Sequence, residues 1–200
     1  MPITANQVKE LRDRSGVGMM DCKKALVESN GDLVKAFELL RKSGIAKAQK
    51  KAGRSAKEGN VVCYIHPGSK LGVLLEVNCE TDFVARTDGF QDFCKDVAMH
   101  IAASSPTYVR VEDIPVEIVE REKDIFRSQL EGSNKPAQVI DKILDGKINS
   151  YYGQVVLLKQ PSIRDPKTTV ADLVAATIAK VGENISIARF ARFKVGEIDK

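Results

Sequence analysis

Two adjacent side chains, Asp82 and Phe83, are the most informative chemical groups in the sequence. They follow a stretch of alternating apolar residues, 72–79, and precede a stretch with helical apolar periodicity that begins near Gly89. A carboxylate and a large aromatic ring therefore stand side by side on a strand-to-helix turn, which is where a fold presents residues to a partner. We treat the turn of residues 81–84 as the first candidate binding site.

The same residues also permit a purely structural interpretation. Phe83 could pack inward against the core, and Asp82 could cap the helix that follows, because aspartate is a favoured N-cap residue. From the local sequence alone, the capped, inward-packed turn is the favoured interpretation, and the binding turn is the alternative.

Groups for conventional catalysis are sparse elsewhere. No glycine-rich nucleotide-binding motif and no Cys-x-x-Cys pair is present in the sequence. Cys79 is in phase with an apolar strand and Cys94 lies on an apolar helix face, so both are expected to be small buried hydrophobic residues. The other candidate metal ligands are Cys22, Cys63, His66 and His100. We expect no metal site, no cofactor and no enzymatic active site.

The composition is that of an ordinary globular protein, with 43% hydrophobic and 29% charged residues in 200. The longest apolar run is far shorter than the roughly 18 to 20 residues of a membrane span. Residues 1–4 show no signal-peptide character. We therefore expect a cytoplasmic protein with reduced thiols, although an organellar location after loss of a targeting segment stays open.

One segment, residues 41–57, is basic without a single acidic residue. Its basic residues are Arg41, Lys42, Lys47, Lys50, Lys51, Arg54 and Lys57. The simplest interpretation is a solvated, flexible linker. The alternative is a basic surface for an acidic partner or a phosphate backbone, although the segment lacks the interleaved aromatic residues that stack on bases.

The first forty-odd residues predict three short helices. Thr4 begins a capping-box pattern, Gly16 ends the first helix, and a second covers residues 19–29. Asp32 caps a third, which we expect to stop at Gly44. Three such helices form only a miniature core.

A glycine-flanked loop, residues 16–20, joins the first two helices. Val17 and the pair Met19 and Met20 are deformable or compact hydrophobic residues that suit adaptable recognition. Val17 and one methionine could equally close the three-helix core.

The remainder predicts an α+β core. Residues 61–66 and 71–79 form a β-hairpin, and the next helix buries one face on it through Phe90, Phe93, Cys94, Val97 and Ile101. Helices are expected from Pro115 to near Gly132, from Pro136, over the ambiguous residues 151–158, and from Thr169 to Gly182. A final strand over residues 185–195 slips in phase, which predicts a bulge or partial burial of both faces. Hairpin and returning strand make a three-stranded antiparallel sheet packed by helices.

Five stretches of the chain resemble the bacterial translation elongation factor Ts family. They cover residues 11–12 with 15–26, then 40–44, 76–85 and 181–185, the last reading Val-Gly-Glu-Asn-Ile. They occur in the family's order and spacing over nearly the whole chain, which makes the resemblance specific.

The resemblance implies a guanine-nucleotide exchange factor for elongation factor Tu, without covalent chemistry. It divides the chain into a three-helix domain like ubiquitin-associated domains, with its basic linker, at residues 1–53, and an α+β core with dimerisation function at residues 54–200. The first domain would dock on the nucleotide-binding domain of the GTPase. The residues implied at this contact are Arg12, Val17, Met19 and Met20.

The resemblance also gives the turn a role. Thr81, Asp82, Phe83 and Val84 would be inserted beside the nucleotide and would displace the bound Mg²⁺ of the partner. Asp82 and Phe83 are the decisive pair in this prediction. Without the resemblance, the inward-packed alternative would remain the stronger one.

Compared with longer members, this chain looks like the short form, which lacks a second core subdomain and a protruding coiled-coil hairpin. The resemblance implies a two-fold homodimer, with the strand from residue 185 and the helix from Pro115 as candidate contacts. We expect no membrane and no direct nucleic-acid partner. Two alternatives remain: a scaffold whose helical module binds peptide partners, and an RNA-binding protein that uses residues 41–57.

Overall fold

The computed structural model describes residues 3–130 and 136–197. Its first three helices are α1 (Ala5–Ser15), α2 (Met19–Glu28) and α3 (Leu33–Lys51). Thr4 and Gln7 form the predicted capping box, and Gly16 ends α1 with a left-handed φ of 66°. The predicted N-cap of α3 is also confirmed, because the carboxylate of Asp32 accepts hydrogen bonds from two backbone N–H groups of its first turn.

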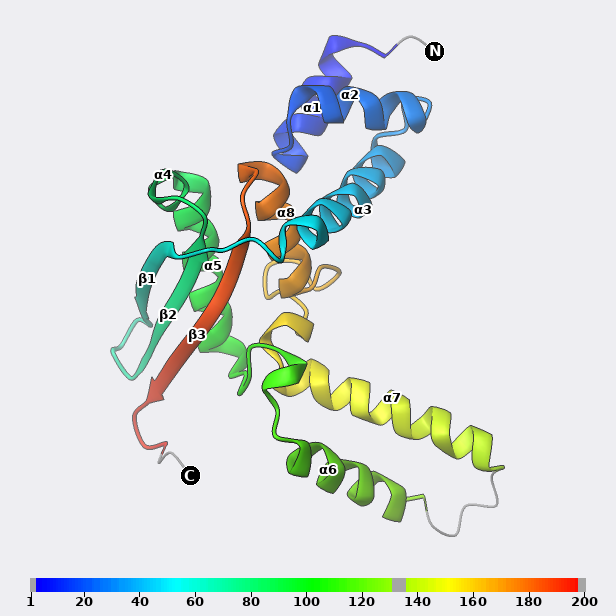
Figure 1. Cartoon of the computed structure of the whole chain (residues 1–200), viewed down its shortest axis with the longest axis vertical. Coiled ribbons are helices and arrows are strands. Elements are labelled where there is room, and N and C mark those ends of the chain that lie inside the picture. The colour runs from blue at the N-terminus through cyan, green and yellow to red at the C-terminus, as the bar shows by residue number, and fades with distance from the viewer. Residues whose placement is uncertain (1–2, 131–135, 198–200) are drawn as a thin grey trace. The chain divides into compact units, whose positions relative to one another are not determined.

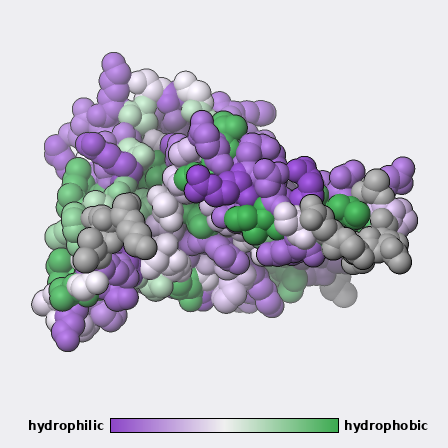
Figure 2. Space-filling view, turned by 90° about the horizontal axis from the view of Figure 1, so that it is seen from below, coloured by the Kyte–Doolittle hydropathy of each residue, from purple (hydrophilic) through white to green (hydrophobic). Residues whose placement is uncertain are grey.

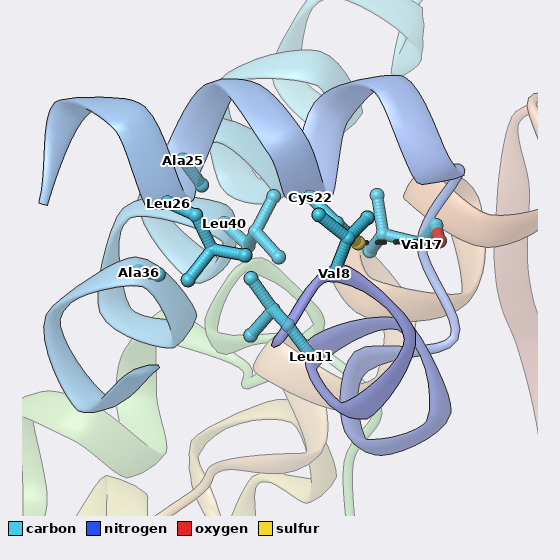
Figure 3. Packing of buried hydrophobic residues seen from close by; sticks show 8 residues of the cluster. All are labelled: Val8, Leu11, Val17, Cys22, Ala25, Leu26, Ala36 and Leu40. Atoms are coloured by element: carbon cyan, nitrogen blue, oxygen red, sulfur yellow. Dashed lines mark hydrogen bonds between the residues drawn. The ribbon is translucent and has the colours of Figure 1, made fainter. Parts of the chain in front are cut away.

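The three helices share one small hydrophobic core (Figure 3). Val17 belongs to it, and its carbonyl accepts a hydrogen bond from the Cys22 thiol at 3.5 Å. The buried members are Val8, Leu11, Val17, Cys22, Ala25, Leu26, Ala36 and Leu40. The α1–α2 loop is therefore anchored in the core through Val17.

The predicted end of α3 at Gly44 is wrong. The helix runs through Gly44 to Lys51, and Gly44 is buried. A Cβ atom at this position would lie 3.5 Å from the Cβ of Ala179 in helix α8 (Val170–Val181). This distance is an ordinary van der Waals contact, so an alanine would also fit. Gly44 is a buried interior position of the helix and does not terminate it.

The predicted three-stranded antiparallel sheet is confirmed, with strand order β1-β2-β3 (Figure 1). β1 (Glu58–Ile65) and β2 (Leu71–Cys79) form the hairpin, and β3 (Ile185–Lys194) pairs with β2. Helix α5 (Asp88–Ser104) lies along one face of the sheet (Figure 1). All five apolar residues predicted on its inner face are buried: Phe90, Phe93, Cys94, Val97 and Ile101.

Burial along β3 does not alternate strictly. Ile185 and Ile187 are buried, Phe190 is half-buried, and Phe193 is 65% exposed although it is in phase with the two isoleucines. The predicted slip in phase is thus visible as a change of the buried face along the strand.

The remaining helices are α4 (Asp82–Ala85), α6 (Val116–Ser128) and α7 (Ala137–Val155), with 3-10 turns at Val111–Asp113 and Leu157–Lys159. The ambiguous residues 151–158 are helical as far as Val155, after which Val156 is extended. Gly132, the predicted end of the helix from Pro115, lies outside the described residues. In the part of the chain that the structure describes, no helix is long and apolar enough to cross a membrane.

The contacts group the chain into two compact units. The first comprises Met1–Val62, Glu76–Lys95 and Asp172–Ala188. The second comprises Cys63–Leu75, Asp96–Ala171 and Arg189–Lys200. Because the strands and α5 contribute residues to both units, the division of the chain near residue 53 stays a prediction.

Candidate functional site

The turn at residues 81–84 begins directly after β2 and contains the short helix α4. Thr81 is its N-cap, with an extended backbone and a side-chain oxygen that accepts from the Val84 N–H at 3.4 Å. Asp82 is the first helical residue, so the alternative in which Asp82 caps the helix is wrong.

Phe83 points outward from this turn. Its side chain is 78% exposed, which is the largest exposed fraction of any large hydrophobic residue among those that the structure describes. Val84 and Ala85, by contrast, are buried. The inward-packed alternative for Phe83 is therefore wrong. Val84 supports the turn from beneath, and Phe83 stands on it as an unburied aromatic ring.

Asp82 also lies at the surface of the turn. Its carboxylate pairs with Arg86 at 2.6 Å, four residues along the chain, and both side chains are substantially exposed. Such exposed pairs contribute about 0 to 1 kcal/mol to stability. The carboxylate can therefore exchange this partner for another donor at low cost.

The turn is held from several directions. Thr81 donates its backbone N–H to one carboxylate oxygen of Glu183 at 3.0 Å and its hydroxyl to the other at 2.7 Å. The Asn60 amide donates to the carbonyl of Ala85 at 2.7 Å. The Cys79 thiol donates to the Thr81 carbonyl at 3.1 Å, and burial raises the pKa of this thiol, which keeps its proton in place. The turn that carries Phe83 is thus held in place by hydrogen bonds to Glu183, Asn60 and Cys79.

Residues 16–20, here called the Met19–Met20 loop, are the second place in the first unit where sequence and exposure indicate recognition, and Met19 and Met20 form the start of α2. Met19 is 55% exposed and Met20 is 67% exposed, and Arg12 on α1 is exposed as well. Val17 closes the module core, whereas neither methionine does. The prediction that this loop closes the three-helix core is therefore correct for Val17 only. Both methionines are exposed and can contact a partner.

The interpretation of residues 41–57 as a flexible linker is wrong for its first eleven residues, because they are part of α3. Several of its cations bind within the protein. Arg41 pairs with Asp172 at 2.7 Å, and Lys47 pairs with Asp21 at 2.7 Å. Lys51 donates to the carbonyl of Gly182.

These contacts leave fewer basic side chains of residues 41–57 free to bind an external phosphate backbone. Arg54 lies 3.6 Å from the carboxylate of Glu80, and its carbonyl accepts from the Asn184 amide at 2.8 Å. The basic residues therefore join α3 and the segment after it to the rest of the first unit.

The cysteines and histidines are the candidate metal ligands that the sequence offers. Among the described residues, no group of three potential ligands could hold a metal ion. Cys79 and Cys94 are buried as predicted, and burial raises the pKa of Cys94 to about 12. His100 is buried in the second unit, where its Nε2 shares a hydrogen bond with the Gln160 side chain at 2.9 Å.

Sequence reasoning missed the residues that brace the turn. Glu183 lies 102 positions from Thr81, and Asn60 lies 25 positions from Ala85. The stretch 181–185 stood out only through its resemblance to a family, with no role attached. A carboxylate directly after the glycine that ends a helix was the available signal.

Comparison with known proteins gives a consistent result. The family described as "Elongation factor TS" matches residues 44–197. The protein "Elongation factor Ts" of Geobacter sulfurreducens is 57% identical over 197 residues, covering 98% of this chain and 91% of the relative. The Fervidobacterium nodosum protein of the same name is 55% identical, with coverages of 98% and 100%. That of Caldanaerobacter subterraneus is 56% identical over 195 residues, with 98% of both covered. The three relatives cover both the Phe83 turn and the Met19–Met20 loop, whereas the family match begins at residue 44 and covers only the turn.

Proposed function

The chain belongs to the elongation factor Ts family, and from this premise we propose that it is a cytoplasmic guanine-nucleotide exchange factor for elongation factor Tu. It acts by binding and forms no covalent intermediate. The observation that carries the mechanism is the Phe83 ring, 78% exposed on a turn that several hydrogen bonds fix.

The turn acts on the magnesium ion of the partner. A GTPase holds GDP through backbone amides, a lysine and a Mg²⁺ ion that bridges phosphate oxygens and protein ligands. Moving the supports of that metal removes a large share of the binding free energy. Thr81 to Val84 are inserted beside the nucleotide, with Phe83 as the leading side chain.

Phe83 supplies the largest share of the free energy for this displacement. An aromatic side chain buries about 150 to 250 Å², and full burial of a phenylalanine side chain contributes about 1.5 to 3 kcal/mol. A thousandfold faster release needs about 4 kcal/mol of barrier lowering. Because the ring is already exposed in the free protein, no internal packing is lost when it enters the partner.

Asp82 supplies an acceptor. Once its carboxylate leaves Arg86, it can draw hydrogen-bond donors of the GTPase away from the groups that orient the metal ligands. Its contribution is smaller than that of Phe83, because the exchange of one surface partner for another gains little.

The three-helix module provides affinity. Met19 and Met20 offer flexible thioether side chains that adapt to the surface of the nucleotide-binding domain. Arg12 adds a donor on the neighbouring helix, and Val17 fixes the loop from inside the core. By linkage, a factor that weakens GDP binding is itself bound more weakly when GDP is present.

The test is release of a fluorescent GDP analogue from elongation factor Tu. The wild-type chain should accelerate release about a thousandfold, and Phe83→Ala should lose about a hundredfold of this acceleration. Val116→Ala, which trims an exposed apolar residue on α6, is the control and should match wild type. No acceleration by the wild-type chain would sink the exchange function. Equal rates for wild type and Phe83→Ala would support the exchange function but contradict the proposed insertion of Phe83.

We further propose that two copies pair through the second unit. One face of its strands exposes apolar side chains: Cys63, Ile65, Leu74, Phe193 and Val195. Figure 2 shows hydrophobic atoms gathered on the side where Figure 1 draws the strands. Covering this face would remove apolar surface from water, and it includes β3, the strand predicted for the contact.

Sedimentation tests the pairing. A species of twice the 21.9 kDa chain mass is expected at micromolar concentration. Phe193→Asp should shift it to the monomer, whereas Val27→Asp on α2 should not. Val116→Asp on α6 tests the helix from Pro115, the other candidate contact. A wild-type chain that sediments as a monomer would contradict the dimer.

A further inference from the structure

A three-residue connection, Gly182 to Asn184, joins α8 to β3. Its first residue, Gly182, has a left-handed conformation with φ of 82°, and β3 begins at Ile185. The connection belongs to the stretch 181–185, to which the exchange mechanism assigns no role so far.

Glu183 uses both oxygens of its carboxylate on one residue. Oε2 accepts the Thr81 backbone N–H at 3.0 Å, and Oε1 accepts the Thr81 hydroxyl at 2.7 Å. Hydrogen bonds to an ionised acceptor are about twice as strong as neutral ones. Thr81 is thereby fixed at two points, in position and in side-chain rotation.

The fixed hydroxyl matters because α4 cannot hold itself. It has four residues, and the Thr81 hydroxyl that caps it lies 3.4 Å from the Val84 N–H, a long contact. Isolated helices of this length are unstable, since nucleation costs more than a few hydrogen bonds return. An external support is therefore required to keep the turn in one conformation.

Asn184 anchors the connection itself. Its backbone N–H donates to the Glu80 carboxylate at 2.6 Å, and its side-chain amide donates to the carbonyl of Arg54 at 2.8 Å. These contacts do not touch α4. They hold Glu183 at the end of β2, so the carboxylate is itself positioned before it binds Thr81.

We propose that Glu183 is a positioning residue for nucleotide exchange. It acts through Thr81 and holds the turn so that Phe83 enters the partner in a preset orientation. The inference rests on the proposed exchange function. Preorganisation of this kind lowers the cost of ordering a loop at an interface, and a small misplacement of an acting group can cost up to about a hundredfold in rate.

The experiment compares Glu183→Ala with Glu38→Ala, which removes an exposed carboxylate on α3, at a temperature where circular dichroism shows both variants folded. Glu183→Ala should slow maximal GDP release at saturating factor by about ten- to a hundredfold. Glu183→Gln, which keeps one carbonyl acceptor, should fall in between. Asn184→Ala loses the side-chain contact to Arg54 and keeps the backbone bond to Glu80, so it should slow release less than Glu183→Ala does. Glu38→Ala should stay within about threefold of wild type, because its side chain takes no part in the support of the turn.

A double-mutant cycle separates positioning from general stability. In the Phe83→Ala background, Glu183→Ala should cause no further slowing, because the residue acts through the turn that carries Phe83. Equal slowing in both backgrounds would overturn the proposal, as would a Glu183→Ala chain that exchanges like wild type.

A measurement on the free chain distinguishes failure of this inference from failure of the exchange function. In Glu183→Ala, the amide hydrogens of Thr81 and Val84 should exchange with solvent at least about tenfold faster than in wild type, with those of β1 unchanged. This result would stand even if the wild-type chain released no GDP. Unchanged protection at Thr81 and Val84 would overturn the positioning role.

Discussion

The Phe83 turn and the Met19–Met20 loop both expose hydrophobic side chains, but they do so in opposite ways. Phe83 stands on residues tied to Glu183, Asn60 and Cys79. Met19 and Met20 follow Gly18, where an added Cβ would meet nothing within 4 Å. One region presents a ring of fixed direction, and the other presents flexible side chains on the first turn of α2.

The difference corresponds to two tasks. A side chain that displaces part of the partner must keep its orientation, so the turn that carries Phe83 is rigidly held. A docking surface gains from side chains that adjust to the contact. We therefore assign the maximal rate of exchange to the turn and the affinity for the partner to the loop and its module.

The largest expected effect is a loss of stability when the core of the three-helix module is altered. Leu26 is fully buried and the adjacent Val27 is 58% exposed on the same helix. Leu26→Ala should destabilise the module by about 2 to 5 kcal/mol, because it leaves a cavity. Val27→Ala should change stability by less than about 0.5 kcal/mol. Urea denaturation followed by circular dichroism measures both.

The consequence for exchange follows from the assignment. Leu26→Ala should raise the concentration of factor needed for half-maximal GDP release, with little change in the rate at saturation. Destabilisation of Val27→Ala to the same extent as Leu26→Ala would contradict the packing in Figure 3.

A smaller effect is expected from the loop itself. The double substitution Met19→Ala with Met20→Ala should weaken binding to elongation factor Tu about tenfold, which is about 1.4 kcal/mol. The matched Met→Leu pair keeps the apolar volume and should retain most of the affinity. Titration of the release rate against factor concentration gives affinity and maximal rate separately. A loss of maximal rate as large as that of Phe83→Ala would erase the distinction between the two regions.

Sequence reasoning succeeded where a local pattern carries its own physical cause. The spacing of Phe90, Phe93 and Val97 gave the buried face of α5, and the alternation after Leu71 gave β2. Thr4 and Asp32 gave the starts of α1 and α3, because capping depends on residues within one turn. These features need no knowledge of distant parts of the chain.

It failed where a distant partner decides the outcome. Gly44 has the form of a helix stop, but it is buried beside Ala179 and the helix continues through it. The basic segment that contains Arg41 and Lys51 was predicted to be free, but Arg41 pairs with Asp172 and Lys51 donates to the carbonyl of Gly182. The support of Thr81 by Glu183 has the same origin, since nothing near residue 81 identifies it.

The most direct test of the central claim compares wild type and Phe83→Ala with and without Mg²⁺. Release of fluorescent GDP from elongation factor Tu is measured at saturating factor, first with millimolar Mg²⁺ and then after chelation by EDTA. If the turn acts by displacing the metal, the advantage of wild type over Phe83→Ala should fall from about a hundredfold to within about threefold once the metal is gone. A hundredfold advantage that persists without Mg²⁺ would contradict the account.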